Sequence, residues 1–260
     1  MLSRAATRFG RKALASWLLN YADASTVQDR QAASHALSGN IDWRQNFQAI
    51  AETQEDKEES PELLRNWLQE PSYLRAHRMV RYWPVIMISA MAIDIVLIVI
   101  GLQPFGYLGI FVFANWMVNR SISKLMVRVQ VTSSKRGKLL RNWSQLIAEI
   151  EGLKGGGAAI ESLQQRLTTQ GRPASAEIAR LASIIANLEF RNTGLPHILM
   201  NTFFFWDIFC LQALEKWKAD LGERVMDWFE VIGEIEALNS LAALRFAFPN
   251  WTTPEIVPGA

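Results

Sequence analysis

The stretch WPVIMISAMAIDIVLIVIGL, which spans residues 83–102, decides the fold class of this chain. Asp94 is the one charged residue among its twenty positions. An α-helix needs about 20 consecutive apolar residues to cross the hydrocarbon core of a bilayer, at a rise of about 1.5 Å per residue. The stretch therefore predicts a transmembrane helix.

A second apolar run, YLGIFVFANWMV at residues 107–118, follows the uncharged turn QPFG. It is shorter than a full span. Positively charged flanks of a span stay in the cytoplasm, so residues 81–120 are expected to form a transmembrane hairpin with both ends cytoplasmic. Trp83 and Trp116 suit the aromatic belts at its edges. The basic residues that flank the hairpin are Arg75, His77, Arg78, Arg81, Arg120, Lys124 and Arg128.

Asp94 lies in the middle of the predicted span. A carboxylate at this depth is costly unless it is protonated or paired, and Asn115 of the second run is a candidate partner. The same residue supports the alternative, in which both runs form a helical hairpin buried inside a soluble protein.

The rest of the chain has helical periodicity. Half of the residues are hydrophobic and 20% are charged, a composition that excludes an intrinsically disordered chain. No segment alternates between apolar and polar residues as a β-strand does. We therefore expect an all-α fold, a bundle of long lever-like helices with the hairpin inserted. Outside the hairpin, helices are predicted over residues 25–37, 40–53, 61–67, 139–153, 158–168 and 175–190, with a solvated loop or a frayed helix end at 54–60.

The first 22 residues are basic and contain no acid, which is typical of a mitochondrial presequence or a signal peptide. An amphipathic helix explains the same residues and is preferred. Its apolar face is expected to contain Leu14, Trp17, Leu18 and Tyr21.

Two helices are expected near the end of the chain, over residues 195–217 and 224–248, joined by a turn at 220–222. They would form an antiparallel pair. We expect the first of them to be buried on all sides in protein, and a third membrane span is the alternative. Asp207 would then lie in an apolar setting and pair with a basic group, for example from the N-terminal helix, whereas Glu230 would face solvent.

No catalytic pattern is found in the sequence. His35, His77 and His197 are too scattered for a metal site, and Cys210 lies in an apolar run typical of a core cysteine. The glycines at 155–157 lack the Lys and Ser or Thr of a phosphate-binding loop and are expected to form a turn. We expect neither enzymatic activity, nor a cofactor, nor a metal.

The two ends of the chain resemble the MutS family. Near the N-terminus, Gly10, Leu14, Trp17, Leu18 and Arg30-Gln31 are similar to the start of its core, or lever, domain. The C-terminal part resembles the closing core helices of membrane-bound MutS-related proteins. The matching residues there are Arg191-Asn192, Asn201, Trp206-Asp207, Leu214-Glu215-Lys216-Trp217, Gly233-Glu234, Glu236-Ala237-Leu238, Ser240-Leu241-Ala242 and Pro254-Glu255-Ile256.

The resemblance implies a membrane-anchored lever module, with Asp207, Trp206, Trp217 and Glu236 as structural or coupling residues. In that family an ATPase domain follows, and the full-length proteins bind ATP and mismatched DNA in mismatch repair. This sequence contains neither a Walker loop nor the Phe-x-Glu motif that reads mismatches. The expected partners are the membrane and either a second copy of the chain or a separate MutS-type ATPase chain.

The expected segments are an N-terminal core part at 1–80, the hairpin at 81–120 and a C-terminal lever part at 121–260, and the expected location is the bacterial inner membrane. Two other functions stay open. One is an unrelated helical membrane scaffold. The other is DNA binding through the basic segment 124–141, although the net charge of +2 gives it little support.

Overall fold

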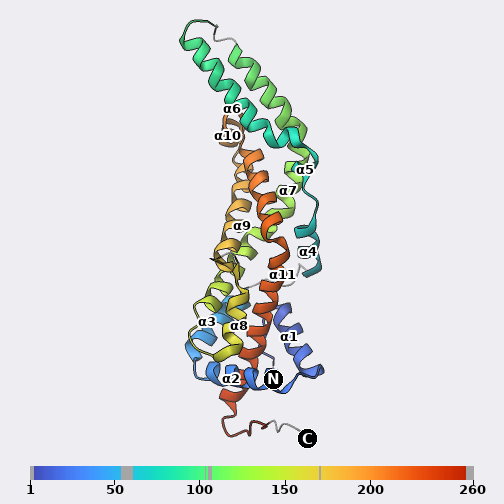
Figure 1. Ribbon diagram of the computed structural model, residues 1–260, viewed down its shortest axis with the longest axis vertical. Helices are drawn as coiled ribbons and strands as arrows, with labels where there is room; N and C mark the ends of the chain where they lie inside the picture. Colours follow the sequence, from blue (N-terminus) through green and yellow to red (C-terminus); the bar gives the residue numbers. More distant parts are fainter. Residues whose placement is uncertain (1–2, 54–60, 103, 105–106, 170, 256–260) are drawn as a thin grey trace. The chain divides into compact units, whose positions relative to one another are not determined.

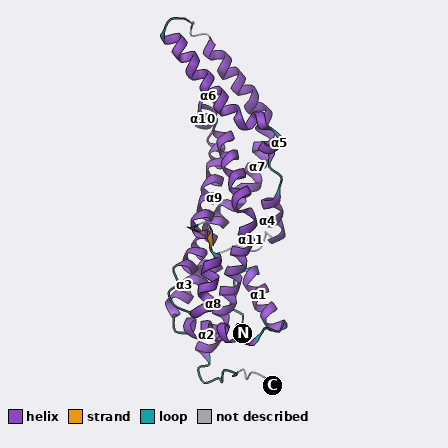
Figure 2. Ribbon diagram, in the orientation of Figure 1, coloured by secondary structure: helices purple, strands orange, loops and turns teal. Residues whose placement is uncertain are grey.

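The computed structural model describes residues 3–53, 61–102, 104, 107–169 and 171–255, and the fold is all-α over this part of the chain. Figures 1 and 2 show the helices and a two-stranded antiparallel hairpin, β1 (Thr168–Thr169) with β2 (Arg172–Pro173). The helices are α1 (Arg8–Leu19), α2 (Ala24–Ser38), α3 (Ile41–Glu52), α4 (Pro61–Gln69), α5 (Tyr73–Ala76), α6 (Arg78–Val99), α7 (Leu108–Glu151), α8 (Gly157–Arg166), α9 (Ala174–Glu189), the 3₁₀ helix η2 (Phe190–Thr193), α10 (Leu195–Phe204) and α11 (Trp206–Ala247).

The chain forms two compact units that interleave along the sequence. The first unit consists of residues 1–66, 139–180 and 222–260, and the second of residues 67–138 and 181–221. The division into an N-terminal core part at 1–80, a hairpin at 81–120 and a lever part at 121–260 stays a prediction. Helices α7, α9 and α11 each contribute residues to both units.

An aromatic cluster lies in the core of the first unit. The ring of Trp143 packs against Phe229 with centroids 4.4 Å apart, and Phe9 contacts both of these rings at 5.8 and 5.4 Å. Aromatic side chains bury large apolar areas, so the cluster ties α1 and the C-terminal half of α11 to the end of α7. The same unit contains these fully buried residues: Phe47, Leu146, Ile147, Ile150, Ile160, Ile178, Trp228, Ile232 and Ile235.

Helix α1 forms as the sequence predicts, but its expected apolar face is wrong in part. Leu14 is buried and Trp17 is half-buried, whereas Leu18 and Tyr21 are exposed. The guanidinium of Arg30 lies 3.8 Å from the centroid of the Trp17 ring, so a cation–π contact covers this side chain.

Most of the short helices agree with the sequence. The cap of α2 is Asp23, whose side chain accepts from the Thr26 amide. Gly155, Gly156 and Gly157 have φ of 78°, 109° and 75° and form the expected turn between α7 and α8. Only glycine adopts such angles at low cost. The loop predicted at 54–60 lies outside the described residues.

The C-terminal helices differ from the expected antiparallel pair. The first ends at Phe204, Phe205 takes the left-handed conformation with φ 55°, and α11 then runs without a break to Ala247. No turn forms at 220–222. Buried residues at positions 217, 221, 225, 228, 232 and 235 continue the helical period through Gly222. A glycine costs about 1 kcal/mol inside a helix, which this burial offsets.

The expected transmembrane hairpin is not supported as such, because, in the part of the chain that the structure describes, only its first helix has the length and apolar character of a span. Within the described residues one helical segment, Met79–Val99 of α6, is long and apolar enough to span a membrane. The second apolar run is the beginning of α7, a helix of 44 residues that continues through its basic flank into the segment predicted separately as 139–153. Helices α10 and α11 pass the same test only as a pair bent by 76°.

Two glycines bring α1 and α11 into close contact. A Cβ atom at Gly233 would lie 2.6 Å from the carbonyl oxygen of Phe9, and one at Gly10 would collide with the side chain of Glu236. Cβ atoms in proteins do not approach backbone oxygens this closely. Both positions therefore require glycine because of the helix packing and not because of a special φ.

We expect Gly233→Ala to destabilise the protein. Overpacking costs about 1–3 kcal/mol, and the atom met is a backbone oxygen with little freedom to move, so the cost exceeds the ~1 kcal/mol that alanine gains in a helix. The melting temperature, followed by circular dichroism, should fall by a few degrees. Gly39→Ala is the control, since nothing lies within 4 Å of its Cβ position. An equal or higher melting temperature for Gly233→Ala would contradict the close packing of α1 on α11.

Candidate functional site: the polar cluster at Asp207

The carboxylate of Asp207 is buried and has three polar partners. Its Oδ2 lies 2.5 Å from Nη1 of Arg191, and its Oδ1 lies 2.8 Å from Nε2 of His197. Asn201 donates from Nδ2 to Oδ2 at 3.3 Å. An uncompensated buried charge costs several kcal/mol, and this arrangement removes that cost.

The break between α10 and α11 creates the cluster. Asn201, one turn before the break, accepts from the backbone N–H of Asp207 at 3.0 Å, so the two residues bond to each other in both directions across Phe205. Asp207 also lies in the first turn of α11, where the helix dipole favours a negative charge. These contacts stabilise the left-handed conformation of Phe205, which costs a non-glycine residue about 1 kcal/mol or more.

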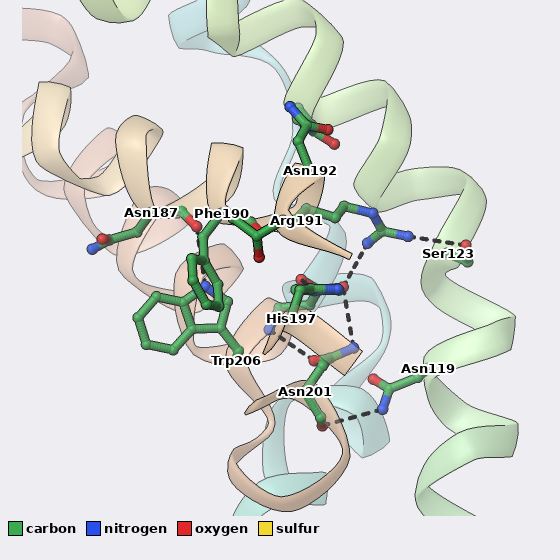
Figure 3. A network of polar contacts seen from close by, with 12 residues as sticks. Asn119, Ser123, Asn187, Phe190, Arg191, Asn192, His197, Asn201 and Trp206 are labelled. Atoms are coloured by element: carbon green, nitrogen blue, oxygen red, sulfur yellow. Dashed lines mark hydrogen bonds and ion pairs between the residues drawn. The ribbon is translucent and has the colours of Figure 1, made fainter. Parts of the chain in front are cut away.

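Polar side chains on one face of α7 extend the cluster. Arg191 donates to Oγ of Ser123 at 3.1 Å, and Asn119 donates to the carbonyl oxygen of Asn201 at 3.4 Å (Figure 3). One turn earlier, Asn115 donates from Nδ2 to the same carbonyl at 3.2 Å and to that of Thr202. Further along α7, Gln130 donates to Oδ1 of Asn192 at 2.8 Å.

Trp206 fixes the beginning of α11 on the end of α9. Its indole Nε1 donates to the carbonyl oxygen of Asn187 at 3.0 Å, and its ring packs 5.5 Å from that of Phe190 (Figure 3). Trp217 is buried further along the same helix. Asp207, Trp206 and Trp217 thus belong to the second unit.

Glu236, the fourth predicted coupling residue, belongs to the first unit. Its Oε1 accepts from the backbone N–H groups of Ala6 and Thr7 at 2.8 and 3.1 Å, and its Oε2 accepts from the Thr7 hydroxyl. Thr7 in turn caps α1. The buried carboxylate of Glu236 therefore holds the segment that leads into the first helix.

The acidic residues near Glu236 have separate environments. Glu230 is exposed, as the sequence predicts. Glu234 and Asp227 both bind Arg166, with 2.6 Å between Oε1 of Glu234 and Nη1 of Arg166. Within the described ranges, no group of three or more His, Cys, Asp or Glu side chains is arranged to hold a metal ion.

The predicted membrane residues differ in exposure. Asp94 and Asn115 are buried, Trp83 is half-buried, and Trp116 is 54% exposed. The guanidinium of Arg120 lies 5.9 Å from the centroid of the Trp116 ring. An exposed tryptophan beside an arginine is typical of the boundary between hydrocarbon and headgroups.

Cys210 is buried, as the sequence predicts. Burial away from water, together with the nearby negative charge of Asp207, raises the pKa of its thiol to about 12. A thiol that stays protonated at neutral pH is a poor nucleophile, so this environment suits a structural cysteine.

The sequence predicts the burial of Asp207 but not its partners. A basic group was expected from the N-terminal helix, and the structure supplies Arg191 from η2 and His197 from α10 instead. In the sequence, His197 is far from the other two histidines, so its spacing indicates no site. No spacing rule links these residues, because the helix break brings them together.

Comparison with protein-family models, with curated proteins and with solved structures finds no match for this chain. The geometry of the Asp207 cluster indicates its role. Its charged groups are mutually compensated and join η2, α10, α11 and α7, so it is suited to holding these elements in register.

We expect Asp207→Ala to destabilise the protein much more than Glu230→Ala. Removal of Asp207 leaves the partly buried Arg191 guanidinium without its carboxylate, and breaking a buried pair costs about 3–5 kcal/mol. The melting temperature, measured by circular dichroism in detergent, should fall by several degrees. Glu230 is exposed, so its removal should change little. Small and equal effects for both variants would contradict the assignment of Asp207 as the centre of the cluster.

Proposed function

We propose that this chain is a membrane-anchored, non-catalytic helical module whose α6 and the first part of α7 form a transmembrane hairpin. The observation that supports this most is the exposure of α6. Only 17% of its most apolar window is buried, whereas an apolar helix from the core of a soluble protein is mostly buried. The exposed large hydrophobic residues of α6 are Met79, Tyr82, Val85, Ile86, Ile88, Ile93, Ile95, Val96 and Val99.

The beginning of α7 has the same character. Ile110, Val112, Phe113 and Met117 are exposed, and the first charged residue of this helix is Arg120. In Figure 1 this part of α7 runs beside α6 in the opposite direction. In water these side chains would form a large exposed apolar patch, whereas contact with lipid would cover them. The basic flanks favour an orientation with both ends of the hairpin in the cytoplasm of a bacterial cell.

Helix α11 supports a lever role of the kind that the MutS resemblance implies. Its 42 residues form one helix from Asp207 to beyond Glu236, and it contributes to both units. A continuous helix with buried polar contacts in each unit transmits displacement better than a loop would. In this proposal an ATPase on a separate partner chain drives the lever, and the hairpin anchors it.

Two alternatives belong to other classes. An unrelated membrane scaffold would use the same hairpin without any ATPase partner. DNA binding depends on the basic segment 124–141, where the side chains of Lys135, Arg136 and Lys138 lie outside the described part of the chain. The positive flank of a membrane hairpin explains this segment without DNA.

The anchor is tested by alkaline carbonate extraction of membranes from cells that express the protein. We expect the chain to stay in the pellet, because a hairpin that crosses the bilayer is not released by the loss of electrostatic contacts. A peripheral protein with a known carbonate-sensitive attachment is the control. Release of the chain into the supernatant would contradict the hairpin and favour a soluble pair of helices.

The proposed lack of ATP binding and hydrolysis is tested by calorimetry with Mg-ATP, and by a phosphate-release assay, on the purified protein. Because the sequence has no Walker loop, we expect no saturable heat of binding and no release of phosphate. Stoichiometric binding of ATP would overturn this part of the proposal and leave the anchor unaffected.

A further inference from the structure

Helix α10 has a buried polar face and an exposed apolar face. His197 and Asn201 point into the Asp207 cluster. The other face exposes large hydrophobic side chains, and the helix, LPHILMNTFF, contains no acid, lysine or arginine. A contiguous apolar face of this kind marks a surface that contacts something other than water. The exposed residues are Leu195, Ile198, Leu199, Phe203 and Phe204.

The end of α10 is adapted to an environment without water. The last four carbonyl groups of a helix have no partner within the helix, and at an exposed end water satisfies them. Here the side chain of Asn115 donates to the carbonyls of Asn201 and Thr202. In hydrocarbon each unpaired carbonyl costs several kcal/mol, so a helix that breaks near a membrane needs such donors from the protein.

The contacts along α7 give the direction of α10. Asn115 and Asn119 contact the end of α10, whereas Ser123 and Gln130 contact residues that precede it, Arg191 and Asn192. The end of α10 therefore points toward the apolar beginning of α7. Asn115 lies five positions before Arg120, which is roughly 7 Å along a helix at 1.5 Å per residue.

The basic residues of α7 are consistent with a position of the end of α10 just below the membrane surface. Arg120, Lys124 and Arg128 are exposed and follow the apolar run at one-turn intervals. Basic side chains at this level attract anionic headgroups, worth about 1 kcal/mol each near the surface. One leaflet of an anionic bilayer suits both the apolar face of α10 and this row of basic residues.

We propose that α10 dips into the leaflet on the side of the basic flanks and turns back at Phe205 without crossing the bilayer. Phe203 and Phe204 enter the region just below the headgroups, where amphipathic helices lie about 5–10 Å deep. This inference rests on the proposed hairpin, because Asn115 sets the depth of α10 only if the beginning of α7 is in the membrane.

Site-specific fluorescence tests the inference. In a Cys210→Ala background, Phe204→Cys and Ile198→Cys are labelled with an environment-sensitive dye, and the full chain is reconstituted into phosphatidylcholine–phosphatidylglycerol vesicles. Lipids that carry a spin label near the headgroup should remove most of the fluorescence at both positions. Lipids with the spin label deep in the acyl chain should remove little.

Two matched positions make the outcomes distinguishable. Ile95→Cys reports on the middle of α6 and should be quenched by the deep label, and Glu230→Cys lies on an exposed position of α11 and should be quenched by neither. Quenching at 95 without quenching at 198 and 204 would overturn the inference and leave the hairpin standing. Absence of quenching at positions 95, 198 and 204 would overturn the hairpin as well. Strong quenching at 204 by the deep label would replace the shallow turn with a full span.

Discussion

The buried charge of Asp207 is the constraint on which the second unit depends. A carboxylate in this position is tolerated only with compensating partners, and Arg191, His197 and Asn201 provide them. These partners come from η2 and α10, so the pairing fixes how the chain enters and leaves the break at Phe205. Asn119 and Ser123 then attach the same elements to α7. One charge therefore determines the register of several helices, and it does so in a region whose outer surface is largely apolar.

Carboxylates at the beginnings of helices recur in both units. Glu236 accepts from the backbone before α1, Glu215 accepts from the amides of Tyr73 and Leu74 at the beginning of α5, and Glu151 accepts from the Ser175 amide at the beginning of α9. The first backbone N–H groups of a helix have no partner within the helix, and the dipole favours a negative charge there. Each acid lies on a different helix from the one whose end it binds, so these bonds join helices in addition to capping them.

The polar residues of the apolar regions have a related role. Asn115 belongs to a run that the sequence identifies as membrane-like, and its side chain satisfies the backbone at the end of α10. An asparagine that interrupts an apolar run is thus explained by a broken helix elsewhere in the chain. Small polar groups of this kind allow an irregular backbone close to lipid, because the protein replaces the hydrogen bonds that water would supply.

The sequence by itself determined the helical character of the chain, the apolar span of α6, the turn at the three glycines and the burial of Cys210 and Asp207. Helical period and apolar length are properties of one segment, so they are visible without its neighbours. The unbroken course of α11 through Gly222 was not predicted: the sequence indicates a turn at 220–222, and only burial in the folded protein continues the helix. The break at Phe205, the pairing of Asp207 with Arg191 and the exposure of Leu18 and Tyr21 were decided only by the tertiary structure. A left-handed phenylalanine and a buried ion pair are stable only when several helices meet around them, and no local pattern records which helices meet.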